Sequence, residues 1–159
     1  MEKLNLKIVA EPELSRILAR AHFSEKKVVF TNGCFDIIHQ GHIEYLINAA
    51  KLGDILIVGL NSDSSVKKLK GEDRPIQDQE SRAKVLASMY FVTYVVIFNE
   101  ETPYDLIKSV QPDFLVKGGD YKVENIVGYD IVKKKGGKVI TIPLVKGYST
   151  TRIINKLNK

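Results

Sequence analysis

Short apolar runs alternate along this chain with segments whose apolar residues recur at a helical spacing. The runs are rich in branched and aromatic residues, show no regular alternation of polar and apolar positions, and cover residues 28–30, 55–58, 94–98, 114–116 and 139–142. This pattern is typical of strands buried on both faces of a parallel sheet. Because strands that alternate with helices build right-handed βαβ units, we predict a single-domain α/β protein with a doubly wound, five-stranded parallel sheet.

The segments between these runs carry the apolar stripes and the end signals of helices. Stripes at i, i+3, i+4 and i+7 occur at residues 14–21, 43–50 and 83–90, and shorter ones occur at 106–110 and 153–157. Pro12 and Pro103 suit first turns, and Gly53 is a candidate C-cap. The run Lys133–Lys135 before Gly136 has the pattern of a helix C-terminus, where cations complement the helix dipole.

Size and composition favour one domain in a reducing compartment. At 159 residues the chain has the length of a single domain, and we expect a helical extension at 1–26 before the main domain at 27–159. The one cysteine, Cys34, excludes an internal disulfide, and no apolar run approaches the roughly 20 residues that span a bilayer. The net charge is +5 but the lysines are spread. We therefore expect a cytoplasmic protein with neither membrane nor nucleic acid as a partner.

The segment after the first apolar run carries the residues with the clearest chemical meaning. Gly33 is predicted to let the chain turn as it leaves the strand, and His39 and His42 flank Gly41 where the next helix begins. Two imidazoles beside free backbone N–H groups and the positive end of a helix dipole suit a polyphosphate. Zinc is the alternative ligand, but it would need further ligands, and the remaining candidates are His22 and Cys34. No metal ligand is predicted.

Two distant motifs resemble those of one superfamily. Residues 33–36 with 39–42 resemble the first signature of the cytidylyltransferase-like nucleotidyltransferases, and residues 148–154 resemble their second motif, a Ser/Thr-rich turn that opens the last helix. Further segments are similar to the heptose 1-phosphate adenylyltransferase branch of this superfamily, at residues 61–63, 67–71, 73–76, 80–82 and 115–121. This branch also occurs as the second domain of bifunctional ADP-heptose synthase. The resemblance extends from Val28 to Leu157.

The resemblance implies a Rossmann-like nucleotidyltransferase fold and a specific reaction. The expected enzyme transfers AMP from ATP, bound as its Mg²⁺ complex, to D-glycero-D-manno-heptose 1-phosphate, giving ADP-heptose and pyrophosphate. The kinase part of the bifunctional form is absent from the sequence, so the resemblance implies a stand-alone enzyme served by a separate kinase and phosphatase. Relatives of this fold often dimerise, so a homodimer is expected.

The resemblance also implies roles for individual residues. We expect catalytic roles for His39, His42 and Lys68, the last chosen from the lysines of a predicted loop that also holds Lys67 and Lys70. The expected nucleotide-binding residues are Asn32, Gly33, Cys34, Phe35, Gly41, Lys117, Gly119, Asp120, Ser149, Thr150 and Thr151. Asp36 and Arg82 are expected to bind the acceptor substrate. Cys34 stands where relatives outside this branch often carry Thr, and a thiol is a weaker hydrogen-bond donor than a hydroxyl.

Each of these roles has a structural alternative. Residues 149–151 could simply cap the last helix, and residues 117–121 could form a plain turn. The lysine run could be a solvated face, Arg82 a surface ion pair, and Asp36 a cap of the following turn. Arg74 could steady the lysine loop.

Three other functions remain open at the level of sequence. A cytidylyltransferase for glycerol 3-phosphate or another small alcohol phosphate would share both end motifs. A non-catalytic, regulatory nucleotide-binding protein would share the fold. A nucleic-acid-binding module would require strongly salt-dependent binding.

Overall fold

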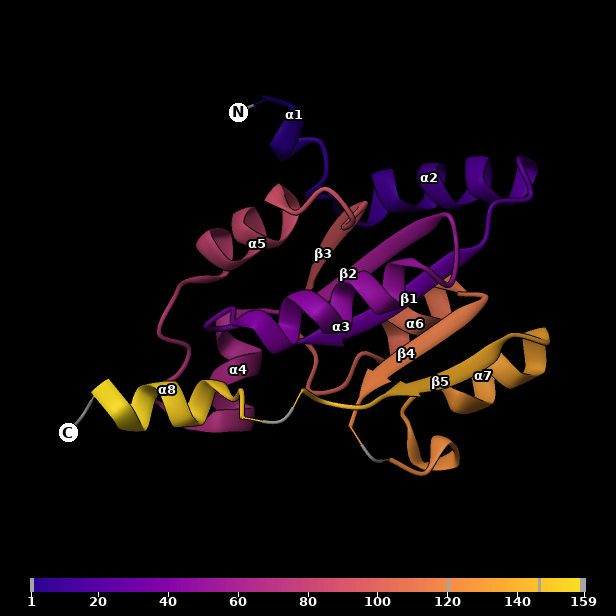
Figure 1. Ribbon diagram of the computed structural model, residues 1–159. Helices are drawn as coiled ribbons and strands as arrows, with labels where there is room; N and C mark the ends of the chain where they lie inside the picture. Colours follow the sequence, from indigo (N-terminus) through magenta and orange to yellow (C-terminus); the bar gives the residue numbers. More distant parts are fainter. Residues whose placement is uncertain (1, 120, 146, 158–159) are drawn as a thin grey trace.

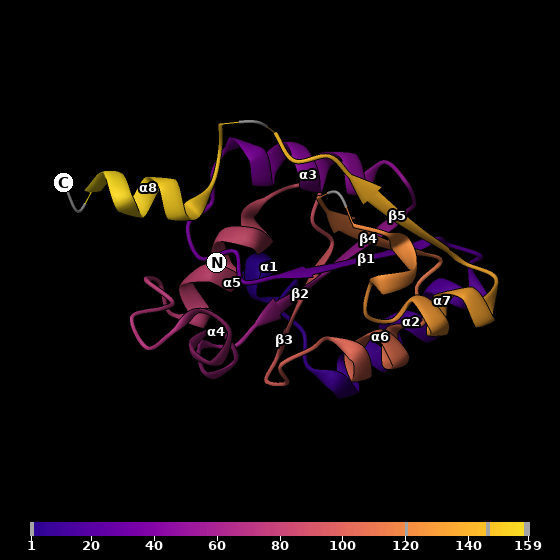
Figure 2. The same ribbon diagram turned by 90° about the horizontal axis from the view of Figure 1, so that it is seen from below.

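A five-stranded, all-parallel sheet lies between two layers of helices (Figures 1 and 2). The computed structural model describes residues 2–119, 121–145 and 147–157. Its strands are β1 (Val28–Gly33), β2 (Ile55–Asn61), β3 (Tyr94–Phe98), β4 (Phe114–Gly118) and β5 (Lys138–Ile142). Its helices are α1 (Glu2–Asn5), α2 (Glu11–Phe23), α3 (Gln40–Ala50), α4 (Asp63–Lys70), α5 (Gln79–Ser88), α6 (Tyr104–Val110), a short 3₁₀ turn η1 (Val123–Asn125), α7 (Tyr129–Lys135) and α8 (Thr150–Leu157).

The strand order makes the sheet doubly wound, which confirms the predicted fold. The strands lie in the order β3-β2-β1-β4-β5, and every pair is parallel. The chain winds outward from β1 through β2 to β3, then crosses back to β4 beside β1. The order of strands therefore reverses between β1 and β4. In open sheets of this kind, ligands bind beyond the carboxyl ends of the strands at that point.

Successive residues of β1 enter two separate cores, one on each face of the sheet. Val28 and Phe30 pack in the core under α2, α6 and α7, whereas Val29 packs in the core under α3 and α5. All three side chains are fully buried. Figure 2 shows α3 on one side of the sheet and α2, α6 and α7 on the other. Burial on both faces explains why the strand residues are apolar at consecutive positions.

The first residues of the chain extend the sheet edge and share its core. Ile8 forms a parallel bridge with Val95, and the Val9 N–H donates to the Val95 carbonyl at 2.9 Å. In α2, Leu14 is fully buried, and Leu18 is 6% exposed. The extension expected at residues 1–26 is thus helical in α1 and α2 and packs on the sheet, and its division from the main domain stays a prediction.

Two local predictions were wrong. The lysine segment after β2 is the helix α4 rather than a loop, capped by the Ser62 hydroxyl, which accepts from the Ser65 N–H at 3.2 Å. Its apolar stripe is too short to be recognised from the sequence. The buried residues of this helix are Ser65 and Val66, and of these two only Val66 is apolar. Gly53 does not cap α3, which ends at Ala50 with Lys51 as its C-cap residue. Instead, a Cβ at Gly53 would lie 2.7 Å from the Lys27 carbonyl oxygen, so glycine permits a close approach of two backbones.

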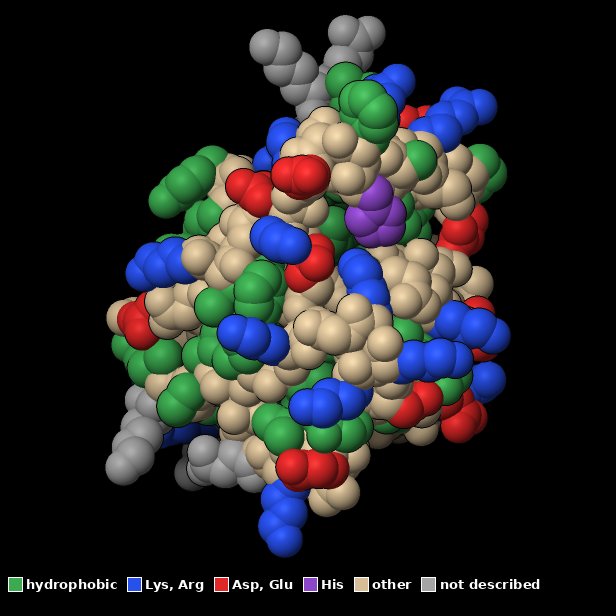
Figure 3. Space-filling model, turned by 90° about the vertical axis from the view of Figure 1, so that its right-hand side faces the viewer, with side chains coloured by type: hydrophobic (Ala, Val, Ile, Leu, Met, Phe, Trp, Pro, Cys, Tyr) green, Lys and Arg blue, Asp and Glu red, His purple; other side chains and the backbone are tan. Residues whose placement is uncertain are grey.

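The surface and helix lengths add two observations. Within the described ranges, every helix is too short or too polar to cross a bilayer. On the face drawn in Figure 3, basic and acidic side chains are interspersed and do not gather into one basic stripe. The basic run of α7 ends at Gly136 (φ 83°), which confirms the predicted helix C-terminus.

Candidate functional site

The carboxyl ends of β1 and β4 meet at the point where the strand order reverses, and the surface is hollowed there. Three adjoining hollows have volumes of about 280, 590 and 190 Å³, and Asn32 and Lys117 line all three. The first hollow lies beside His39, His42 and the start of α8. The second is lined by Lys70, Glu101 and Thr151 among others, and the third by Tyr121, Asn125, Ile126 and Val127.

His39 and His42 form a stacked pair at the amino end of α3. His39 is the N-cap residue, and the two rings are parallel to within 21°, with centroids 3.9 Å apart. In the described part of the chain, Nδ1 of each ring is buried without a hydrogen-bond partner. Burial, together with the charge of the neighbouring His39, lowers the pKa of His42 from 6.5 to about 4, and burial also lowers the pKa of His39. Both imidazoles are therefore neutral at pH 7 and ready to interact with a ligand.

The start of α8 is tied to the start of α3, although more than a hundred residues separate them. The Tyr148 hydroxyl donates to the Gln40 side-chain oxygen at 2.7 Å, and the Thr150 hydroxyl donates to the Ile37 carbonyl at 3.2 Å. The Ser149 hydroxyl accepts from the Arg152 N–H at 3.1 Å, so Ser149 caps α8 as the structural alternative predicted. The first hollow is lined by His39, His42, Ser149 and Thr150 together. The two helix N-termini expected to bind one polyphosphate thus face one hollow.

The glycines of the first motif make room for side chains. Gly33 is the last residue of β1, and the residue with a positive φ in the following turn is Phe35 (φ 44°), two residues after the predicted position. A Cβ at Gly33 would lie 3.0 Å from the Phe35 ring, and one at Gly41 would lie 3.2 Å from the His39 ring. Gly41 therefore allows His39 to fold over α3. Its predicted contact with phosphate stays a prediction.

The prediction for Lys68 is corrected by the helix that contains it. Residues two apart on a helix point in different directions, and Lys70 lines the second hollow whereas Lys68 is exposed outside the three hollows. Lys67 lies 3.9 Å from the Glu72 carboxylate. Because the segment is helical rather than a loop, Lys70 is the lysine that its geometry brings to the site.

Asp36 holds protein groups in this structure, and its role as a ligand for sugar hydroxyls stays a prediction. Its carboxylate accepts from Arg74 Nε at 2.6 Å and from the backbone N–H groups of Ile76 and Gln77 at 2.8 and 3.0 Å. Burial alone would raise the pKa of Asp36, but these hydrogen bonds outweigh it and lower the pKa. The acceptor positions of this buried carboxylate are occupied, so Asp36 anchors the segment before α5. Arg74 steadies that segment, as its structural alternative suggested.

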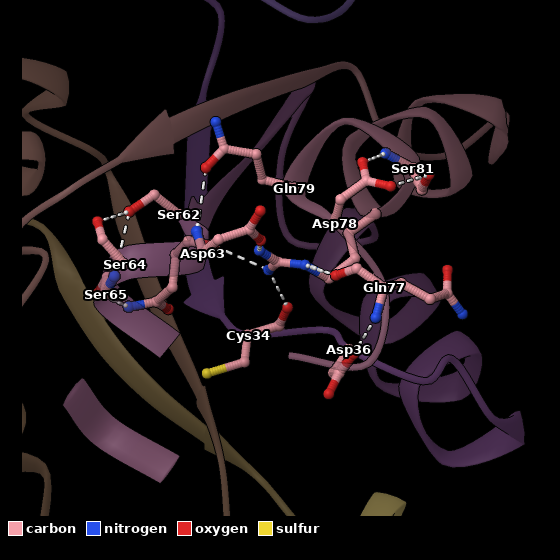
Figure 4. Close-up of polar contacts among 12 residues, drawn as sticks. Cys34, Asp36, Ser62, Asp63, Ser64, Ser65, Gln77, Asp78, Gln79 and Ser81 are labelled. Atoms are coloured by element: carbon pink, nitrogen blue, oxygen red, sulfur yellow. Dashed lines mark hydrogen bonds and ion pairs between the residues drawn. The ribbon is translucent and has the colours of Figure 1, made fainter. Parts of the chain in front are cut away.

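Arg82 is likewise buried and bonded to protein groups, and its role as a substrate ligand stays a prediction. Its guanidinium donates to the carbonyls of Gln77, Cys34 and Asn61 at 3.0, 2.7 and 2.8 Å. It also pairs with Asp63 at 2.7 Å, and its side chain is 0% exposed. Figure 4 shows how Cys34, Asp63 and Gln77 converge from separate segments. The alternative of a surface ion pair is wrong, because the Arg82 side chain is fully buried, although that of Asp63 is 36% exposed.

Several predicted nucleotide-binding residues do line the hollows. Asn32, Gly33, Cys34 and Phe35 line the first and second hollows, and Thr151 lines the second. Burial raises the pKa of the Cys34 thiol, so this cysteine is a thiol at pH 7. Gly119 takes φ 117° and donates its N–H to the Ile142 carbonyl at 2.9 Å, a conformation that favours glycine. Asp120 lies outside the described residues.

Other lining residues were not singled out from the sequence. Leu144 and Val145 line the first hollow, and Glu101, Thr102 and Pro103 line the second. The first two follow β5 and the last three follow β3. The sequence signal that could have identified these residues is their position directly after the carboxyl ends of strands, where ligands bind in such sheets.

The acidic and sulfur-bearing side chains do not assemble a metal centre in the described ranges. There, three or more His, Cys, Asp or Glu side chains do not come together in a group that could hold a metal ion. The stacked histidines consequently lack the further ligands that a zinc site requires.

Comparisons with known proteins identify a matching family and several similar proteins. The family model described as cytidylyltransferase-like matches residues 30–156. Bifunctional protein HldE of Citrifermentans bemidjiense is 53% identical over 144 residues, which are 91% of this chain and 30% of that protein. Bifunctional protein HldE of Campylobacter concisus is 56% identical over 151 residues, which are 95% of this chain and 31% of that protein. The chain thus spans about a third of the length of these curated relatives.

Solved structures share the fold. The lipopolysaccharide core biosynthesis protein of Thermoplasma volcanium is 31% identical with a TM-score of 0.62, over 78% of this chain and 99% of that one. Pantoate-beta-alanine ligase of Francisella tularensis, at 17% identity and a TM-score of 0.66 over 93% of this chain and 72% of that one, shows likeness of fold alone.

Proposed function

Because this chain belongs to the cytidylyltransferase-like family, we propose that it transfers AMP from ATP to D-glycero-D-manno-heptose 1-phosphate, giving ADP-heptose and pyrophosphate. The observation that carries the proposal is the convergence of the stacked histidines and the start of α8 on the first hollow. Similarity to proteins named HldE and to a lipopolysaccharide core biosynthesis protein supports the choice of acceptor.

The proposed reaction needs positioning and charge stabilisation rather than a covalent nucleophile. An oxygen of the acceptor phosphate attacks the α-phosphorus of ATP, and a new P–O bond forms while the bond to the bridging oxygen between the α- and β-phosphates breaks. The electron pair of that bond leaves with pyrophosphate. Such phosphoryl chemistry depends mainly on alignment and on stabilising the spread negative charge.

The stacked histidines supply that stabilisation in the proposal. His39 and His42 are neutral without a ligand because burial lowers the pKa of each. A polyphosphate beside them favours their protonated forms, so binding of the anion raises these pKa values and creates positive charge where the reaction needs it. The N–H groups at the starts of α3 and α8 add fixed dipoles.

Magnesium enters the proposal as part of the substrate. The described residues include no cluster suited to a resident metal ion, and Mg²⁺ commonly binds through phosphate oxygens while it keeps several waters. ATP is therefore proposed to bind as its Mg²⁺ complex.

A turnover screen tests the reaction. Pyrophosphate release is measured with ATP or CTP, each paired with α- or β-heptose 1-phosphate or glycerol 3-phosphate. We expect release with ATP and one heptose 1-phosphate anomer. Release with CTP and glycerol 3-phosphate instead would favour the cytidylyltransferase, and tight ATP binding without release would favour a regulatory nucleotide-binding protein.

The cellular setting of this reaction forms part of the same proposal. We propose that the chain acts in the cytoplasm as a homodimer, and that a separate kinase and phosphatase act on the same series of sugar phosphates. Size-exclusion chromatography with light scattering tests the dimer.

A further inference from the structure

We propose that Lys117 and Lys70 bind the phosphate group of the acceptor, and that this pair restricts the reaction to phosphomonoester acceptors. The inference rests on the proposed function and deepens it. It places the acceptor's anionic group in the second hollow, which His42 also lines, whereas His39 lines the first hollow and not the second.

Lys117 occupies the junction of the three hollows. It lies in β4 beside the reversal of strand order, and its ammonium donates to the Asn32 side-chain oxygen at 3.2 Å. Both residues line each of the three hollows. A group held at this ammonium can therefore touch ligands in the first and second hollows at once, as an attacking phosphate must.

The first and second hollows differ in chemistry. Leu144, Val145 and Tyr148 line the first, which gives it the apolar walls that a nucleoside requires. The second is lined by Lys70, Glu101, Thr102 and Asn61. Cations can hold a phosphate there, while the carboxylate, hydroxyl and amide groups can bind sugar hydroxyls. The second hollow, at about 590 Å³, is the roomier of the two and suits a sugar phosphate.

The two lysines are the cations available in the second hollow. Arg74 also lines it, but its guanidinium is engaged by the Asp36 carboxylate through Nε and a second nitrogen. In the described ranges, neither Lys70 nor Lys117 lies within 4.0 Å of a carboxylate. An ammonium carries three donors, and the hydrogen bond to Asn32 uses one of those of Lys117.

The electrostatic state of Lys117 fits an anionic ligand. Burial lowers its pKa, and the nearby charge of Lys70 lowers it further. Two like charges beside one hollow repel each other until an anion lies between them. A phosphate dianion would therefore relieve the repulsion and make charge-assisted hydrogen bonds to both ammonium groups.

The test separates acceptor binding from nucleotide binding. Lys117→Met removes the charge and keeps the length of the side chain, Lys117→Arg keeps the charge, and Lys138→Met is a matched control on the exposed amino end of β5. Initial rates of pyrophosphate release are measured while heptose 1-phosphate is varied at saturating Mg-ATP. Calorimetry measures the Kd of Mg-ATP without acceptor.

We expect Lys117→Met to lower kcat/KM for the acceptor by about 10- to 100-fold, the range of a lost charge-assisted hydrogen bond. Its Kd for Mg-ATP should change by less than about threefold. Lys117→Arg should recover part of the loss, and Lys138→Met should behave as wild type. An equal loss in Mg-ATP affinity, or an unchanged acceptor kcat/KM, would overturn the inference.

Inorganic phosphate distinguishes failure of this inference from failure of the proposed function. In the wild type, phosphate should bind in the absence of nucleotide, and Lys117→Met and Lys70→Met should each weaken that binding. If the wild type releases pyrophosphate with none of the acceptors, the proposed reaction fails. Lysine-dependent phosphate binding would still support the anion site, and equal binding by all variants would refute it.

Discussion

The histidines of the first motif are held uncharged by the fold. Stacking at 3.9 Å puts two titratable rings in contact, and both Nδ1 atoms are buried without partners in the described part of the chain. Protonation of one ring therefore opposes protonation of the other, in addition to the cost of burial. An unpaired buried polar group is expensive, and such groups concentrate where a ligand completes them.

Removal of one ring should reduce turnover far more than acceptor binding. We expect His42→Ala to lower kcat by about 10²- to 10³-fold, by analogy with the loss of one preorganised charge-stabilising donor. Its affinity for the sugar phosphate should stay near that of the wild type. His22→Ala is the matched control, since His22 is exposed on α2. Steady-state pyrophosphate release checks both variants, and near-wild-type turnover of His42→Ala would contradict the role proposed for it.

The neutral state of His42 should also appear in the pH dependence of stability. The unfolded chain takes up a proton near pH 6.5, whereas the folded chain holds His42 neutral down to about pH 4. The unfolding free energy therefore falls as pH drops from 6.5 to 4, by about 1–2 kcal/mol once partial solvent exposure is allowed for. Urea denaturation at several pH values should show a smaller fall for His42→Gln. Parallel curves for the two proteins would contradict the burial of this imidazole.

At the scale of elements, the buried Arg82 and the partly buried Arg74 hold the segments around the site in place. Arg82 in α5 joins the carbonyls of Cys34 after β1 and Asn61 at the end of β2. Arg74 and the segment after it bind Asp36. These contacts connect the motif that carries the histidines to the helix α4 that carries Lys70. The geometry of the second hollow thus depends on Asp36, Arg74 and Arg82, whose charged groups are bonded to other parts of the protein.

Loss of the Asp36 carboxylate should destabilise the protein. Asp36→Ala leaves Arg74 and two backbone N–H groups without their acceptor, and we expect a loss of about 3–5 kcal/mol.

The lowered pKa of Asp36 has a second consequence. Its stabilising contribution is present above the ordinary pKa of 3.8 and is lost as pH falls through the lowered folded-state value. Urea denaturation measures both effects, with the exposed Asp73→Ala in the same segment as control. Equal stability of the two variants would show that the Asp36 contacts contribute little.

At the scale of the molecule, the helix α2 before β1 completes the core on one face of the sheet. Leu14 and Leu18 of α2 pack in the same core as Phe30 and Ile57. The chain before residue 26 is therefore built into the sheet's covering layer, and its removal would expose that core.

Truncation of one side chain in α2 tests this integration. Leu14 is fully buried, so Leu14→Ala should reduce the unfolding free energy by about 2–5 kcal/mol through lost burial and a cavity. Leu6→Ala, at a side chain that is 72% exposed, should change it little. Both variants should unfold in one transition by circular dichroism and fluorescence. A separate early transition in Leu14→Ala would mean that α2 folds independently of the sheet.

Local pattern in the sequence was sufficient for the five strands, the fold class and the family, but not for the helix α4. Each strand reveals itself by consecutive apolar residues, and the Gly136 cap and the motif around His39 are short-range features. The doubly wound class follows from the same pattern, because alternating strands and helices allow few topologies, whereas the order β3-β2-β1-β4-β5 came from the structure. The family resemblance that these motifs predicted is confirmed.

Tertiary structure alone decided which charged side chains face the hollows. Asp36, Lys68 and Arg82 look as available in the sequence as Lys70 and Lys117 do. Whether a charge reaches a ligand or a protein partner depends on contacts between residues 38 to 85 positions apart, and on the unrecognised helix α4. Burial and long-range hydrogen bonds set those contacts, and neither is encoded in the local spacing of residue types.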